Sequence, residues 1–167
     1  MNNPLNKTHI YASPANLNLI NRSAGLSVHR LLDVGAGTGS NIIALKQLHP
    51  KAHAAAITCS ELEAEKLREV ADETLIVDLN NFSDSTDWQG IGYRDEPFDL
   101  IILSHVLEHL QEPRQVLSSI SNLLKPTGRM LIALPNVCHW RTRLQIAQGR
   151  FKYEDAGILD RSHLRFF

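Results

Sequence analysis

The chain has 167 residues, of which 43% are hydrophobic and 21% charged, the size and composition of one globular domain. Its net charge of -1 provides no overall positive field to attract nucleic acid or an anionic membrane. Cys59 and Cys138 form no metal-binding or disulfide pattern, and no apolar leader or membrane-length apolar run is present. We therefore expect a cytoplasmic protein with no membrane segment and no nucleic-acid partner.

Strand-sized apolar runs alternate with helix-sized amphipathic runs along the chain, which is typical of βα units in a parallel sheet. The run 98–103 is almost entirely apolar, as expected of a strand covered on both faces. We expect strands at 30–34, 52–58, 74–77, 98–103 and 129–134. The pattern predicts a doubly wound, Rossmann-like α/β fold whose mainly parallel sheet has about five strands and helices on both faces.

Capping signals predict where the helices begin. Ser13-Pro14 indicates the start of the first helix, with Leu17 and Ile20 facing inward. Ser60 followed by Glu63 is a capping box, in which each side chain binds a free backbone N–H of the other. A further helix begins near Pro113, and the residues 125–128, Lys-Pro-Thr-Gly, predict a turn before the last strand.

The most informative segment is the glycine-rich turn 33–39, Asp-Val-Gly-Ala-Gly-Thr-Gly, between the first strand and its helix. Ligands of open parallel sheets lie beyond the carboxyl ends of the strands, where glycines and free helix N–H groups meet them. A dinucleotide fingerprint requires glycine where Ser40 stands, and no Gly-Lys-Ser/Thr phosphate loop follows. Asp33, two residues before the first glycine, suits a ligand with an ammonium group, while a tight turn without a ligand stays the alternative.

Four segments together resemble a known family. Residues 31–40 resemble motif I of class I S-adenosylmethionine-dependent methyltransferases, and 98–113, FDLIILSHVLEHLQEP, resembles their motif after strand four. Residues 134–137, LPNV, and 157–167, GILDRSHLRFF, are similar to a narrower branch. That branch contains MetW-like proteins of methionine biosynthesis and methyltransferase domains encoded beside glycosyltransferases. The resemblance covers nearly the whole chain and implies S-adenosylmethionine as cofactor and S-adenosylhomocysteine as product.

The resemblance also implies roles for individual residues, in three groups along the cofactor. The methionine portion would be held by Asp33 and the backbone of Gly35, Ala36, Gly37, Thr38 and Gly39. Asp78 and Leu79 would contact the adenine, and Ser104 and His105 would lie near the transferable methyl group.

One position departs from the family pattern. At the end of strand two the family usually has an acidic residue that binds both ribose hydroxyls, and this chain has Thr58. A hydroxyl lacks the two acceptor oxygens of a carboxylate. Loss of the charge-assisted hydrogen bond that a carboxylate would accept typically costs about 1.5–3 kcal/mol of binding free energy. Thr58 stays our expected ribose neighbour, with Glu61 as the nearest acid in the sequence.

Two histidines follow strand four. His105 is our candidate general base for a hydroxyl acceptor, and His109 lies four residues further on. A structural role in lining the pocket is the alternative. The same letters spell H-x-x-E-H, the spacing of inverted zinc peptidases. Because the segment stands at the family's motif position directly after a buried strand, we expect no metal ion.

The regions divide into an N-terminal arm and helix (1–28), a cofactor-binding core (29–135) and a C-terminal lid or substrate region (136–167) within one domain. Basic and aromatic residues after His139 fit either a lid for an anionic or sugar-like acceptor or a solvated helix with an aromatic face. The family's sheet normally continues with two antiparallel strands, so we expect either a truncated chain or a minimal version of the protein without them. The edge of the 129–134 strand would then pair in a homodimer or with a protein partner.

Three functions follow from these observations. The first is a methyltransferase acting on a small or sugar-like acceptor. The second is a cofactor-binding or scaffolding protein that partners another enzyme, as some MetW-like relatives partner an acyltransferase. A nicotinamide-dependent oxidoreductase is disfavoured by Ser40 and by the absence of an acid after strand two.

Overall fold

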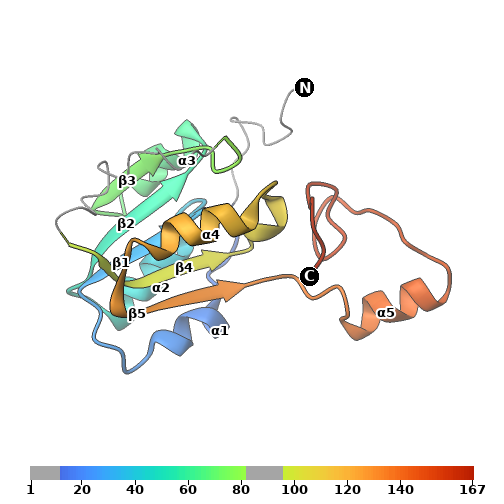
Figure 1. Ribbon diagram of the computed structural model, residues 1–167, viewed down its shortest axis with the longest axis horizontal. Helices are drawn as coiled ribbons and strands as arrows, with labels where there is room; N and C mark the ends of the chain where they lie inside the picture. Colours follow the sequence, from blue (N-terminus) through green and yellow to red (C-terminus); the bar gives the residue numbers. More distant parts are fainter. Residues whose placement is uncertain (1–11, 82–95) are drawn as a thin grey trace.

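The computed structural model describes residues 12–81 and 96–167 (Figure 1). Within them a five-stranded sheet has the order β3-β2-β1-β4-β5, and every strand pairing is parallel. The strands are β1 (Arg30–Val34), β2 (His53–Thr58), β3 (Glu73–Ile76), β4 (Phe98–Ser104) and β5 (Leu124–Ala133). The Rossmann-like α/β prediction is confirmed, and the expected strands differ from the observed ones mainly at their ends.

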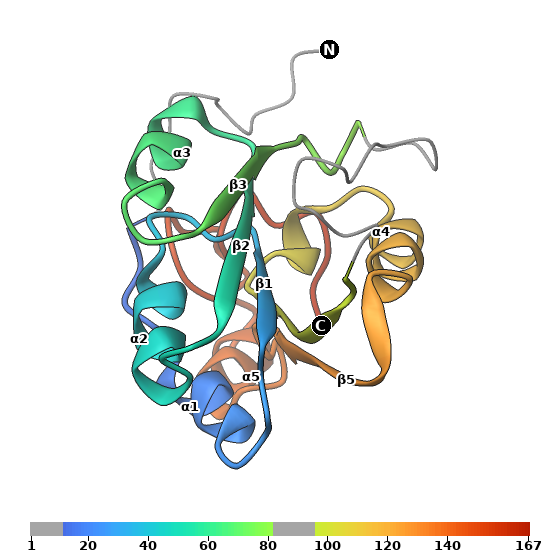
Figure 2. The same ribbon diagram turned by 90° about the vertical axis from the view of Figure 1, so that its left-hand side faces the viewer.

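Helices cover both faces of the sheet (Figure 2). On one face lie α1 (Leu17–Ile20), α2 (Ser40–Leu48) and α3 (Glu61–Leu67), and on the other lies α4 (Pro113–Ser121). Alternate residues of each strand point to the two hydrophobic cores, one on each face of the sheet. Leu31 packs in the core beneath α1, α2 and α3, and Leu32 packs in the core beneath α4. Both side chains are fully buried, as in a parallel sheet covered on each side.

Two local predictions were wrong. The first helix begins at Leu17 with Asn16 as its cap, and Leu17 is exposed, although Ile20 is buried as expected. The segment 125–128 lies within β5. Between the Phe98–Leu124 and Leu100–Arg129 pairs, β5 advances five positions and β4 only two, so the extra residues bulge. A Cβ at Gly128 would lie 2.9 Å from the Phe98 carbonyl oxygen, so the bulge requires glycine.

β5 forms an edge of the sheet, with Ile132 and Leu134 partly exposed. The chain then runs out to α5 (Trp140–Ala147), which stands away from the sheet in Figure 1. After α5 it returns in irregular conformation to the carboxyl ends of the strands, where the backbone N–H of Leu164 donates to the Glu108 carbonyl. Among the described residues, no helix is long and apolar enough to cross a membrane. The sequence shows no clear period at 79–97, and most of this stretch, 82–95, lies outside the described residues.

Candidate functional site

A cavity of about 920 Å³ opens at the carboxyl ends of β1 to β4, the position expected for a ligand of this fold. It brings together most of the residues singled out by the sequence. Those that line it are Gly35, Ala36, Gly37, Thr38, Thr58, Asp78, Leu79, Ser104, His105 and His109. Asp33 and Gly39, at the two ends of the turn, do not line the cavity.

The glycine loop needs glycine for both conformation and space. Gly35 has a φ of 70°, and a Cβ there would lie 2.6 Å from Cγ2 of Val106. Gly39 precedes α2 and has a φ of 85°, and a Cβ there would lie 2.6 Å from Cγ2 of Val70. Side chains other than glycine are strained in this left-handed region. The backbone N–H groups of Gly35 and Ala36 both donate to the Ile57 carbonyl, which holds the loop against β2.

Asp33 is fully buried at the end of β1, and neither of its carboxylate oxygens has a hydrogen-bond partner of normal geometry among the described residues. Burial raises the pKa of Asp33 to about 8, and contact with the Asn41 side chain opposes this rise. A buried carboxylate without a partner is costly, so such groups are usually neutralised or matched by a ligand. A positive charge bound at the adjacent glycine loop, such as the ammonium group of the expected cofactor, would favour the charged form of Asp33.

A carboxylate from α3 lies next to Thr58 in the cavity wall. The Thr58 hydroxyl donates to the carboxylate of Glu63, and both side chains are buried and line the cavity. Thr58 also accepts from the backbone N–H of Ser60, whose hydroxyl caps α3 by accepting from the N–H of Glu63. Glu61, the nearest acid in the sequence, is exposed and does not line the cavity. The capping box offered the signal for Glu63, but its pairing with Thr58 depends on the fold.

His105 begins the irregular segment after β4 and has a φ of 58°. Its Nδ1 lies 3.3 Å from Oε1 of Glu108, whose side chain is fully buried. The Glu108 carboxylate raises the pKa of His105 above its usual value, against a smaller effect of burial. A left-handed conformation at a residue other than glycine costs energy and commonly marks a functional site. The imidazole that faces the cavity is therefore both oriented and made more basic by one carboxylate.

The H-x-x-E-H letters do not lie on one α-helix. Leu107–His109 forms a 3-10 helix, η3, so His105 and His109 are not one helical turn apart on a common face. Nδ1 of His109 instead lies 3.3 Å from both the carbonyl and the hydroxyl oxygen of Ser162 in the C-terminal segment. Burial lowers the pKa of His109. The inverted-zincin arrangement is therefore excluded by geometry.

Sequence reasoning named no individual residues for two parts of the cavity wall, although it expected a C-terminal lid or substrate region at 136–167. Residues 12–16 line it, where Asn16 donates to the Ser104 hydroxyl and joins the arm to β4. From the C-terminal region, residues 155–158, Asp160 and His163 line it. None of the basic residues that follow His139 lines the cavity, which favours the alternative of a solvated helix over a basic lid. No sequence period marks these irregular segments.

Comparisons with known proteins agree with this geometry. Demethylmenaquinone methyltransferase of Clavibacter sepedonicus is 34% identical over 111 residues, covering 65% of this chain and 42% of that protein. tRNA 5-carboxymethoxyuridine methyltransferase of Escherichia coli strain K12 is 27% identical over 131 residues, covering 77% of this chain and 48% of that protein. The chain thus spans less than half the length of these two curated relatives.

Among solved structures, coclaurine N-methyltransferase bound to N-methylheliamine and S-adenosylhomocysteine is similar in fold, with a TM-score of 0.55 at 19% identity. The match covers 71% of this chain and 35% of that one. Residues 6–166 match the family described as a methyltransferase domain. The narrower MetW-like resemblance stays a prediction. The chain belongs to the methyltransferase-domain family, whose cofactor is S-adenosylmethionine.

Proposed function

We propose that the protein transfers a methyl group from S-adenosylmethionine to a small, uncharged acceptor with a hydroxyl group, such as a sugar-like molecule. One observation carries this proposal: a single cavity joins the glycine loop to the His105 imidazole. Its volume of about 920 Å³ falls within the range of small-molecule and cofactor sites.

The charges of the cavity wall support an uncharged acceptor. Five acidic side chains line it, whereas none of its described lining residues is Lys or Arg. The acidic residues are Glu63, Asp78, Glu108, Asp155 and Asp160. An anionic acceptor would be repelled by these carboxylates, and a phosphate group would lack the basic partner that it normally has.

The cofactor residues have complementary roles in this proposal. Asp33, buried at the base of the glycine loop, attracts the ammonium group electrostatically from behind the cavity wall, and the N–H groups and open space of the loop accommodate the methionine portion. Glu63, oriented by Thr58, takes the place of the missing acid and accepts from the ribose hydroxyls. Asp78 and Leu79 line the cavity after β3, where the resemblance implies the adenine.

His105 is the proposed general base. S-adenosylmethionine supplies a methyl group that is already activated, so the protein must mainly position the acceptor and remove its proton. The His105 imidazole can accept the hydroxyl proton while Glu108, 3.3 Å away, stabilises the positive charge that forms. His109 also lines the cavity and stays a second candidate base, but its Nδ1 is engaged by Ser162.

Calorimetric titration of the protein with S-adenosylmethionine and S-adenosylhomocysteine tests the cofactor site. Gly37 lines the cavity at a φ of 53°, so the side chain of Gly37→Arg is expected to fill the loop. We expect micromolar binding in the wild type and none in the variant. Transfer of tritium from labelled cofactor to sugars and phenols, with bulk tRNA as the competing acceptor, then tests the substrate class. Exclusive labelling of tRNA would contradict a small-molecule acceptor.

A protein partner is a second candidate feature, favoured by the exposed edge of β5. Ile132 and Leu134 are 38% and 36% exposed there, and apolar edge strands tend to pair. One solved structure of similar fold is a complex between the Haloferax volcanii methyltransferase activator Trm112 and a methyltransferase. We propose that a second copy or a partner covers β5. Gel filtration with light scattering tests this, and a monomer at high concentration would contradict the dimer.

A further inference from the structure

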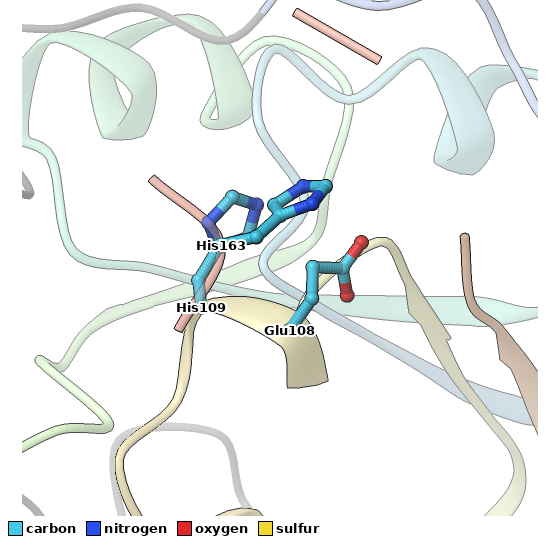
Figure 3. A group of neighbouring side chains, drawn as sticks. All are labelled: Glu108, His109 and His163. Carbon is cyan, nitrogen blue, oxygen red and sulfur yellow. The ribbon is translucent and has the colours of Figure 1, made fainter. Parts of the chain in front are cut away.

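Three side chains that commonly bind metal ions meet at the cavity, from two segments far apart in the sequence. Glu108 and His109 belong to η3, and His163 belongs to the C-terminal segment (Figure 3). One donor atom from each lies within 4.8 Å of the others. Zinc donors lie 2.0–2.2 Å from the ion, so two of them are at most about 4.4 Å apart. Small side-chain rotations therefore bring all three within binding distance.

One oxygen of the carboxylate in this cluster lacks a partner among the described residues. The Glu108 side chain is fully buried, and neither oxygen makes a hydrogen bond of normal geometry to a described residue. Oε1 lies 3.3 Å from Nδ1 of His105, while Oε2 has neither a hydrogen-bond nor an ion-pair partner in the described part of the chain. Burying a carboxylate without a partner is costly, and a bound cation removes that cost.

Both imidazoles are oriented by carbonyl groups. Nδ1 of His109 lies 3.3 Å from the carbonyl oxygen of Ser162, and Nδ1 of His163 lies 3.1 Å from that of Ile158. A carbonyl can only accept, so Nδ1 carries the proton in each ring and the lone pair is on Nε2. This is the outer hydrogen bonding that orients metal-binding histidines. The Ser162 hydroxyl also donates to Asp160, which fixes the segment further.

We propose that Glu108, His109 and His163 bind a divalent transition-metal ion, with Zn²⁺ as the best match, and that this ion fastens the C-terminal segment 154–167 to the core. Two imidazoles and one carboxylate form a ligand set that zinc takes and that magnesium and calcium, which prefer oxygen ligands, do not. The backbone bonds from Leu164 and Arg165 to the Glu108 carbonyl already align the two segments. All three ligands line the cavity, so further coordination positions face it.

The site differs from the zinc motif considered from the sequence. That motif would use His105 and His109 on one helix, whereas here His163 supplies the second imidazole from 54 residues beyond His109. Only folding of the C-terminal segment assembles the set, which explains why the spacing of the sequence did not predict it. The inference does not depend on methyl transfer.

Zinc titration of the chelator-treated full chain tests the proposal. We expect one equivalent of Zn²⁺ to bind, Co²⁺ to produce a visible absorption band, and zinc to protect residues 154–167 from limited proteolysis. Loss of a ligand in His163→Gln or Glu108→Gln should weaken zinc binding by at least about 100-fold, beyond the 10–100-fold typical of outer partners. Circular dichroism establishes that each variant is folded.

The matched control is His139→Gln, since His139 is exposed and outside the cluster. This variant should bind zinc like the wild type. An unchanged zinc affinity in His163→Gln, or a wild type that binds zinc no better than the variants, would overturn the site. Zinc binding that leaves the rate of proteolysis within 154–167 unchanged would contradict the proposal that the ion holds this segment against the core. Asp33→Asn, which should lose S-adenosylhomocysteine, is expected to keep zinc, so failure of this inference is distinct from failure of the cofactor site.

Discussion

The two walls of the cavity are built in different ways. One wall consists of strand ends, where the glycine loop, Thr58 and Ser104 follow parallel strands whose core side chains are almost completely buried. The other wall is irregular chain, 155–163, most of it partly or fully exposed. Backbone bonds from Leu164 and Arg165 to Glu108 are among its few ties to the core.

This difference separates two tasks. The strand-end wall is as rigid as the sheet, so the groups proposed to hold the cofactor are positioned before it binds. The C-terminal wall buries little apolar surface, and such regions open locally at a small fraction of the global unfolding free energy. We infer that cofactor affinity depends on the first wall, and that entry of the acceptor depends on opening of the second.

The largest effect is expected from adding a methyl group behind the glycine loop. In Gly35→Ala the new Cβ would lie 2.6 Å from Val106 at a φ of 70°, so strain and overpacking should cost about 2–5 kcal/mol of unfolding free energy. Urea denaturation measures this loss. Gly25→Ala is the control, since Gly25 has a φ of 82° but nothing within 4 Å, and it should cost only about 1–2 kcal/mol. Equal losses would mean that packing at the loop is unimportant.

Replacing the buried carboxylate of the same wall should separate binding from stability. Asp33→Asn is expected to weaken S-adenosylhomocysteine binding by at least about 100-fold, because breaking a buried charge pair costs about 3–5 kcal/mol. Without ligand, the variant should be more stable than the wild type at pH 8. Burial raises the pKa of Asp33 from 3.8 to about 8, so the folded protein keeps a proton that the unfolded chain releases. Wild-type stability therefore falls as pH rises from 4 to 8, by up to about 1.4 kcal/mol per unit.

Urea denaturation at pH 5, 6.5 and 8 checks the sign of this effect, and Asp99→Asn provides the opposite case. Burial acts to raise the pKa of Asp99, but Lys125 and the backbone N–H groups of Arg30 and His29 together hold it below its usual value. The ionised Asp99 carboxylate therefore stabilises the folded state at every pH above the pKa of Asp99 in the unfolded chain, and this stabilisation is lost as the pH falls. Asp99→Asn should consequently destabilise the protein at pH 8. Both variants shifting stability in the same direction at pH 8 would contradict this account.

A smaller effect is expected at the carboxylate supplied by α3. Glu63→Gln keeps the shape of the side chain but removes the charge, so S-adenosylhomocysteine should bind about 10–100-fold more weakly, as for a lost charge-assisted hydrogen bond of about 1.5–3 kcal/mol. Calorimetry measures the affinity. Glu61→Gln is the matched control on the same helix, since Glu61 is exposed outside the cavity. A similar change in both variants would assign the effect to the net charge of the protein.

The same contrast explains what the sequence could predict. β1 matched the expected bounds and residues 35–38 of the glycine turn lined the cavity as expected, because both depend on local patterns with a known period or backbone requirement. Glu63 was recognised as a cap but not as a cavity residue, since its role depends on Thr58 in a neighbouring strand. His163 carried no periodic signal, because it reaches the cavity through irregular chain fixed only by tertiary hydrogen bonds.

The smallest effect should appear in the C-terminal wall alone. Ser162→Ala removes a hydroxyl that donates to Asp160 at 2.7 Å and lies 3.3 Å from Nδ1 of His109. A hydrogen bond of this kind contributes about 0.5–1.5 kcal/mol, so proteolysis within 154–167 should become about two- to tenfold faster. The global unfolding midpoint should hardly move, because the segment opens without the sheet. Ser121→Ala, which removes a hydroxyl bond at the end of α4, should leave this cleavage unchanged. A parallel fall in global stability would instead mean that the two walls unfold as one unit.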